Sequence, residues 1–141
     1  MAQCPDVSII VPAYNSSAIF SKLYERLTNV MQALNRSYEI VVIDDCSQDR
    51  TYDVVAKHAS ADTHLVAARL RSNVGIDRAL QAGITLANGQ VLVVMDDDLQ
   101  HAPEDIPTLL VEVERGFDVV YGAFPKKHHA PWKRWASSLH D

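Results

Sequence analysis

Three clusters of polar residues could together bind a metal and a phosphate. They each follow an apolar run, and they are Tyr14-Asn15, Asp44-Asp45 and Asp96-Asp97-Asp98. Five neighbouring carboxylates repel one another unless they are protonated or a cation binds among them. Carboxylate and amide oxygens are hard ligands that suit Mg²⁺ or Mn²⁺, and phosphates and water commonly complete the coordination of such an ion. The clusters therefore predict a divalent metal that carries a phosphate-bearing ligand.

Capping offers a simpler interpretation for some of these residues. Asp and Ser side chains accept hydrogen bonds from free N–H groups at helix starts, so Asp44-Asp45, Ser47 and Asp49 also suit a turn and a cap. We expect Asp49 to cap. The acidic triplet does not fit a cap, because one acid suffices and the next helix is expected only at Pro103. The segment Asn73-Val74-Gly75 suits a turn before a helix, and it equally suits a phosphate or sugar contact.

Several common binding motifs are absent from the sequence. Neither Gly-x-Gly-x-x-Gly nor Gly-x-x-x-x-Gly-Lys-Ser/Thr occurs, which argues against a glycine-rich dinucleotide site and a P-loop. The histidines lack metal-ligand spacing, and Cys4 and Cys46 lie too far apart for a Cys-x-x-Cys site. Two unpaired cysteines fit a reducing compartment. A nucleotide bound without a glycine-rich loop would need a metal for its phosphates.

Alternating strands and helices must position these clusters. Short β-branched runs predict strands, and apolar residues at three- and four-residue steps predict helices. Strands are expected at 7–11, 38–43, 64–70, 91–95 and 117–121, and helices at 19–34, 51–59, 76–87 and 103–114. This order predicts a Rossmann-like α/β domain with a mostly parallel sheet and helices on both faces. Ligands of such folds bind at the carboxyl ends of the strands, where the clusters are expected to meet.

Length and charge restrict the class of protein further. The 141 residues, 48% of them hydrophobic, can bury one core, so residues 1–141 are expected to form one domain. The net charge of −5 argues against a nucleic-acid partner. The N-terminus lacks the basic and apolar regions of a signal peptide, and no apolar run approaches the ~18 residues of a membrane span. We therefore expect a cytoplasmic chain.

The last twenty residues have a different character. They combine an excess of basic residues with two tryptophans: Lys126, Lys127, Trp132, Lys133, Arg134 and Trp135. Such a segment favours an anionic partner or a membrane interface, and a helix whose tryptophans pack on the body is an equally good interpretation. Residues 132–141 look like a helix start without a stop signal, which predicts a chain truncated at its C-terminus.

Three motifs in this order resemble the family 2 glycosyltransferases with the GT-A nucleotide-sugar-binding fold. The matching segments are residues 10–15, 42–49 and 96–100, and the resemblance spans nearly the whole chain. It implies that the nucleobase is held by Pro12, Tyr14 and Asp45. It also implies that Asp96 and Asp98 are catalytic and that the metal on the diphosphate is held by Asp96, Asp98 and Gln100. The rest of the donor site is expected to comprise Asn15, Asp44, Asn73, Gly75 and Asp97.

Within that family, other segments are similar to enzymes that transfer a sugar to a polyprenyl phosphate. These segments are residues 99–100, 103–104, 116–122 and 132–134. The similarity implies a nucleoside-diphosphate sugar as donor and a lipid-linked phosphate as acceptor. It also implies membrane segments beyond residue 141, at the cytoplasmic face of the inner membrane. Tyr14 and Asp45 favour a UDP- or dTDP-type donor. The acceptor phosphate is expected to contact Lys126, Lys127 and Arg134.

Two alternatives remain open. A glycan hydroxyl as acceptor would need a carboxylate base, which the family usually places beyond residue 141, whereas a phosphate acceptor is already ionised. With a hydroxyl acceptor, this chain alone is therefore expected to bind donor without turning it over. A magnesium-binding receiver domain of a signalling protein also gathers acids at strand ends, but there the acidic pair is expected after the first strand, where Tyr14-Asn15 stands.

Overall fold

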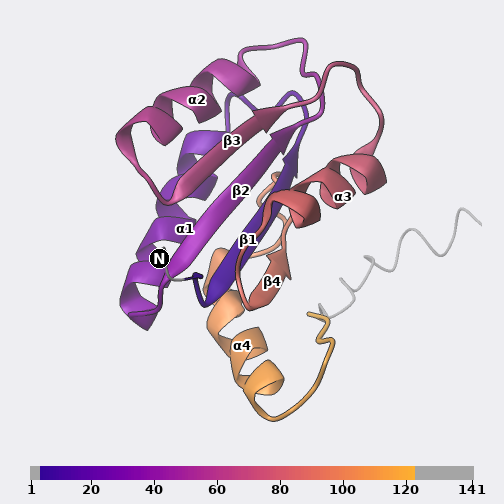
Figure 1. The fold of residues 1–141 in the computed structure, drawn as a ribbon. Helices are drawn as coiled ribbons and strands as arrows, with labels where there is room; N and C mark the ends of the chain where they lie inside the picture. Colours follow the sequence, from indigo (N-terminus) through magenta and orange to yellow (C-terminus); the bar gives the residue numbers. More distant parts are fainter. Residues whose placement is uncertain (1–3, 123–141) are drawn as a thin grey trace, which may run out of the picture.

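The computed structural model describes residues 4–122, and this part of the chain contains one sheet of four parallel strands (Figure 1). The strands are β1 (Val7–Ala13), β2 (Tyr38–Asp44), β3 (Leu65–Arg69) and β4 (Val91–Val94). Their order in the sheet is β3-β2-β1-β4, so the direction of winding reverses between β1 and β4. Ligands of doubly wound sheets bind at such a reversal.

Four helices cover both faces of the sheet. They are α1 (Phe20–Leu34), α2 (Thr51–Ala61), α3 (Ile76–Leu86) and α4 (Ile106–Glu114), and a 3-10 turn, η1 (Pro103–Asp105), precedes α4. In Figure 1, α3 lies on one side of the sheet and α1 on the other. The predicted α/β fold with a parallel sheet is confirmed. In the described part, no helix combines the length and the apolar character needed to cross a bilayer.

Strands β1 and β2 are largely apolar because both of their faces are buried. All seven residues of β1 are buried, and β1 pairs with β2 in a register that sets Ile9 beside Ile40 and Ile10 beside Val41. Ile9 and Ile40 face the larger core, which α1, α2 and α4 cover. Val41 faces the opposite layer with Ala79 of α3. Burial on both faces is typical of parallel sheets, and it explains why these strands lack alternation.

Helix α3 approaches the sheet closely because it carries a glycine at the contact. A Cβ atom at Gly83 would overlap Ile10 Cγ2 and lie 3.3 Å from Ile43 Cγ1. Ile10 and Ile43 are fully buried, so neither can move aside easily. Gly83 therefore sets the distance between α3 and the sheet.

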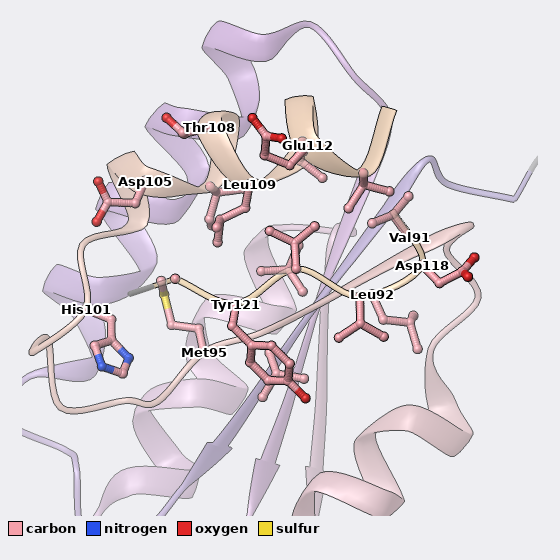
Figure 2. A pocket seen from close by; sticks show the side chains of 18 of the residues that line it. Val91, Leu92, Met95, His101, Asp105, Thr108, Leu109, Glu112, Asp118 and Tyr121 are labelled. Atoms are coloured by element: carbon pink, nitrogen blue, oxygen red, sulfur yellow. The ribbon is translucent and has the colours of Figure 1, made fainter. Parts of the chain in front are cut away.

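The expected fifth strand at 117–121 is wrong. Phe117, Val119 and Tyr121 are 58%, 65% and 87% exposed, and the segment forms no strand. Asp118 and Tyr121 line the same hollow as the β4 residues Val91 and Leu92 (Figure 2), and β4 is the edge strand of the sheet. An extended segment becomes a strand only when a neighbour takes its backbone hydrogen bonds, and periodicity does not reveal that neighbour. The other predicted elements lie within two residues of their observed bounds, except that 103–105 is a 3-10 turn. The helix expected from Trp132 lies outside the described residues.

Replacing Gly83 by valine is expected to lower the free energy of unfolding by about 2 kcal/mol, because the added methyl groups overpack a rigid contact. Chemical denaturation of the variant and the wild type measures the effect. Gln81→Val is the matched control, since Gln81 is an exposed residue of the same helix. An equal decrease in the free energy of unfolding in the two variants would show that α3 does not depend on close approach at Gly83.

Candidate functional site

Strand β1 continues past the end of β4, so its residues 11–13 have no β4 partner at the reversal of strand order. Met95 N donates to Ile10 O at 3.1 Å, so the backbone polar groups of Ile10 point toward β4. Those of Pro12, two residues later, point the same way, where β4 has already ended. Proline has no N–H to donate, so the β1–β4 ladder does not continue at Pro12. The loops after β1 and β4 meet beyond this point, where a doubly wound sheet is expected to have its ligand crevice.

The loop that follows β1 is held by side chains, one for each of four successive backbone N–H groups. The donors are the backbone nitrogens of residues 14–17, and the acceptors in order are Asp97 Oδ2 (3.1 Å), Ser47 Oγ (2.9 Å), Thr51 Oγ1 (2.7 Å) and Asp49 Oδ2 (3.1 Å). Asn15 Oδ1 in turn accepts from Gln48 N at 2.9 Å. The ring of Tyr14 is 44% exposed and remains accessible to a ligand.

Each loop at the carboxyl edge of the sheet contains a residue with left-handed backbone. These residues are Asn15 (φ 53°), Cys46 (φ 58°), Gly75 (φ 91°) and Leu99 (φ 60°). Non-glycine residues adopt this conformation rarely, at a cost of roughly 1–2 kcal/mol each. Such strain tends to cluster at functional sites, where loop shape serves binding rather than stability.

Asp44 is placed differently from its expected role as a ligand contact. Its carboxylate is fully buried, forms an ion pair with Arg69 Nε at 3.1 Å and accepts from Ser47 N at 3.3 Å. Arg69 also donates to Ser47 O at 2.9 Å, and its guanidinium lies 5.6 Å from the centre of the Tyr52 ring. Asp44 therefore braces the loop after β2. Sequence analysis missed Arg69, whose only signal is a charge at the end of a strand.

Asp45 holds the neighbouring loop. Its two carboxylate oxygens accept from Val74 N and Gly75 N, each at 2.8 Å, and its side chain is almost completely buried. This contact brings the exposed residues Asn73 and Gly75 to the edge where Tyr14 lies. Asp45 thus joins the loops after β2 and β3.

The three acids of the triplet Asp96-Asp97-Asp98 point in different directions. Asp97 Oδ2 accepts from Tyr14 N and from Ser16 Oγ. Burial raises the pKa of Asp97, although the hydrogen bonds from Ser16 and Tyr14 oppose that shift. Asp98 is exposed, and its Oδ1 accepts from Gln100 N at 2.9 Å. Within residues 4–122, no hydrogen bond or ion pair engages the carboxylate of Asp96. Asp98 is therefore the exposed acid of the triplet, and Asp96 is half-buried but without a protein partner among residues 4–122.

A sequence model decides the family of this chain. The model described as "Glycosyl transferase family 2" matches residues 8–140. The chain belongs to glycosyl transferase family 2. This assignment removes the receiver-domain alternative, because the matched region contains all three motifs.

Curated relatives of this family 2 chain are similar over most of its length. A protein of Pseudomonas syringae named undecaprenyl-phosphate 4-deoxy-4-formamido-L-arabinose transferase is 37% identical over 134 residues, and one of the same name from Salmonella choleraesuis is 32% identical. Each alignment covers 94% of this chain but only 40% or 41% of the relative. The chain therefore spans about two fifths of the length of these relatives.

Solved structures confirm the GT-A fold. Staphylococcus aureus TarS 1-349 in complex with UDP-GlcNAc has a TM-score of 0.63 and 25% identity, over 78% of this chain and 31% of that one. The mannosyltransferase PcManGT of Pyrobaculum calidifontis, in complex with GDP-Man and Mn²⁺, has a TM-score of 0.64 and 23% identity, over 77% and 32%.

The residues of the family 2 site fit a metal that arrives with a ligand rather than a preformed cation cage. Among residues 4–122, no group of three or more His, Cys, Asp or Glu side chains is arranged to hold a metal. Mg²⁺ and Mn²⁺ suit one or two carboxylates, with phosphate and water in the other positions. Asp96 and Asp98 offer two accessible carboxylates, and Gln100 adds an amide oxygen.

Two features lie apart from this site. A hollow of about 1090 Å³ lies between β4, α4 and residues 118–122, and none of the strand-end acids lines it. Figure 2 shows Val91, Leu92 and Leu109 around it, so its walls are largely apolar. The expected acceptor residues Lys126, Lys127 and Arg134 lie outside the described residues.

Asp49 lies one residue before Arg50, the N-cap residue of α2, whose side chain makes no capping hydrogen bond, and Asp49 provides that hydrogen bond instead. Its Oδ1 accepts from Thr51 N, at the first residue of α2, at 2.9 Å, and its Oδ2 accepts from Ser17 N. Burial acts to raise the pKa of Asp49, but hydrogen bonds from Thr51 and Ser17 outweigh it and lower the pKa to about 2. The ionised form therefore stabilises the start of α2.

Asp49→Ala is expected to lower the free energy of unfolding by about 1 kcal/mol at pH 7. Since the pKa is lower in the folded state than the ~3.9 of an unfolded chain, the ionised carboxylate contributes fully above about pH 5. That contribution is lost as the pH falls toward 2, so the difference from wild type should shrink. Urea denaturation between pH 7 and pH 2.5 measures it.

Asp53→Ala is the control for this experiment. Asp53 is an exposed acid of α2 that pairs with Arg50 at 3.5 Å, and such pairs contribute little. If Asp49→Ala were no more destabilising than Asp53→Ala at pH 7, the capping role would be wrong.

Proposed function

We propose that this chain is the donor-binding part of a metal-dependent, inverting glycosyltransferase, which moves a sugar from a nucleoside diphosphate to a polyprenyl phosphate. The observation that carries the proposal is the meeting of an exposed aromatic ring and two accessible acids at one crevice. Asp97 Oδ2 lies 3.1 Å from Tyr14 N, so the triplet and the Tyr14 loop are in direct contact at the reversal of strand order. A nucleoside diphosphate with its metal needs a base contact and a metal contact on neighbouring loops.

The base side consists of the loops after β1, β2 and β3. We assign base stacking to the exposed ring of Tyr14 and a sugar or phosphate contact to Asn73 and Gly75. Asp45 already accepts two N–H groups, but carboxylate oxygens have further lone pairs that can accept the ring N–H of a uracil or thymine. Asn15 shapes this side by accepting a hydrogen bond from Gln48 N, and the fully buried Asp44 shapes it through Arg69. A UDP- or dTDP-type donor follows, and TarS was solved with UDP-GlcNAc.

The metal side consists of Asp96, Asp98 and Gln100, with Mg²⁺ or Mn²⁺ as the ion. The ion, when bound, supplies neutralisation of the charge that develops on the leaving diphosphate. Asp96 and Asp98 hold the ion and so orient the diphosphate, and no protein nucleophile is required for direct displacement at the sugar. The Mn²⁺ complex of the Pyrobaculum mannosyltransferase, with the same fold, supports the use of a divalent ion.

The acceptor is the polyprenyl phosphate that the names of the curated relatives state for those proteins. A phosphate is ionised at neutral pH, so basic side chains rather than a general base are needed to position it. We assign this role to Lys126, Lys127 and Arg134, and we place the full-length protein at the cytoplasmic face of a membrane.

Asp98→Asn is expected to weaken Mn²⁺-dependent binding of UDP at least tenfold, because the ion loses one of its two carboxylates. The fold should survive, since one source of repulsion in the triplet is removed. Calorimetric titration with UDP, with and without Mn²⁺, measures the effect.

Asp118→Asn is the matched control, because Asp118 is an exposed acid that lines the hollow instead of the crevice. An unchanged affinity in Asp98→Asn would reject the metal assignment. GDP in place of UDP tests the base side in the same titration, and tighter binding of GDP would reject a pyrimidine donor.

Replacing Lys126, Lys127 and Arg134 together by alanine, in the full-length protein, is expected to reduce transfer to polyprenyl phosphate at least tenfold. UDP affinity should stay nearly unchanged, because the donor site lies on other segments. Transfer assays with a polyprenyl phosphate and with a soluble glycan measure the effect. Transfer to the glycan that proceeds equally well in both proteins would instead support a hydroxyl acceptor.

A further inference from the structure

Asp97 stands in sequence between the two proposed metal ligands, but its side chain turns away from them. Its Oδ2 accepts from Tyr14 N at 3.1 Å and from Ser16 Oγ. These partners lie more than eighty residues earlier in the chain, on the loop that carries the exposed ring of Tyr14. One carboxylate therefore joins the metal side of the crevice to its base side.

The Tyr14 loop is held on its other flank by the loop after β2. Asn15 N donates to Ser47 Oγ and Ser16 N donates to Thr51 Oγ1, so this flank is anchored to the start of α2. Asp97 supplies the anchor from the β4 side. The position of Tyr14 relative to Asp96 and Asp98 thus depends on Asp97.

We propose that Asp97 is a positioning residue, which sets the separation between the base side and the metal side of the donor site. The proposal rests on the proposed function, because it needs a ligand that spans both sides. A nucleoside diphosphate with its metal makes contacts at both sides at once, so it gains from a crevice already held at the correct width. A ligand that uses one side alone gains nothing from that spacing.

This role differs from direct coordination of the metal. Oδ2 of Asp97 is engaged by two donors, and the side chain is partly buried, whereas Asp98 is exposed. An amide oxygen can accept the same two hydrogen bonds that Oδ2 accepts, but an amide is a poor substitute for a carboxylate on Mg²⁺ or Mn²⁺. Asp97→Asn therefore separates the two roles.

The experiment compares two ligands on the 141-residue chain. Calorimetry with UDP in the presence of Mn²⁺ reports on a ligand that spans the crevice, and a chemical-shift titration with uridine reports on the base side alone. In Asp97→Ala, we expect UDP to bind about tenfold more weakly and uridine affinity to change less than twofold, since two hydrogen bonds to a charged group are lost. Asp97→Asn should keep UDP affinity within about threefold of wild type.

Glu39→Ala is the matched control. Glu39 Oε1 also accepts from a serine hydroxyl and a backbone N–H of distant segments, Ser8 Oγ at 2.6 Å and Asn88 N at 2.5 Å, but at the opposite edge of the sheet. Glu39→Ala should lower the free energy of unfolding about as much as Asp97→Ala does, and it should leave UDP affinity unchanged. Ser16→Ala removes one of the two hydrogen bonds of Asp97 and should weaken UDP binding about threefold. This variant provides the test if Asp97→Ala does not fold.

The possible outcomes are distinct. Wild-type protein that fails to bind UDP would reject the proposed function itself. If wild type binds UDP and Asp97→Ala binds it equally well, the positioning role is wrong. If Asp97→Asn and Asp97→Ala weaken UDP binding equally, Asp97 is a metal ligand. If Asp97→Ala weakens UDP binding and uridine binding equally, Asp97 acts on the base side alone. Either result would overturn the proposal.

Discussion

Strand β1 is longer than β4, and the candidate site depends on that difference in length. The last residues of β1 pair with β2 on one side and have no β4 residue on the other, so the crevice begins at Pro12. A parallel sheet whose winding reverses between these strands brings the loops after β1 and β4 to the same gap. Tyr14 and the acidic triplet occupy those loops.

Stability and function draw on different parts of the molecule. The buried strands and the close approach of α3 at Gly83 stabilise the fold through apolar contact. The loops at the carboxyl edge contain left-handed residues and crowded acids, both of which oppose folding. Side chains such as Thr51 and Asp49 offset part of that cost by accepting backbone N–H groups of the Tyr14 loop.

The five strand-end acids fall into two groups with different structural roles. Asp44, Asp45 and Asp97 turn inward and hold loops through an arginine or through backbone N–H groups. Asp96 and Asp98 remain accessible at the crevice. This division limits the repulsion among the acids, because the inward group is neutralised or hydrogen-bonded before any cation binds. It also explains how a chain with so many acids can keep two for a metal without a preformed cage.

The sequence by itself determined the order of strands and helices, the polar clusters at the strand ends, the capping role of Asp49 and the family. Those features depend on local periodicity or on contiguous motifs, and both can be read along the chain. Only the tertiary structure decided which acids face the crevice. Asp97 finds its partners at Tyr14 and Ser16, and Asp44 finds its partner at Arg69, through contacts between distant segments. The same limit explains the fifth strand expected at 117–121, since strand formation requires a pairing edge and no pattern within the segment shows whether one is present.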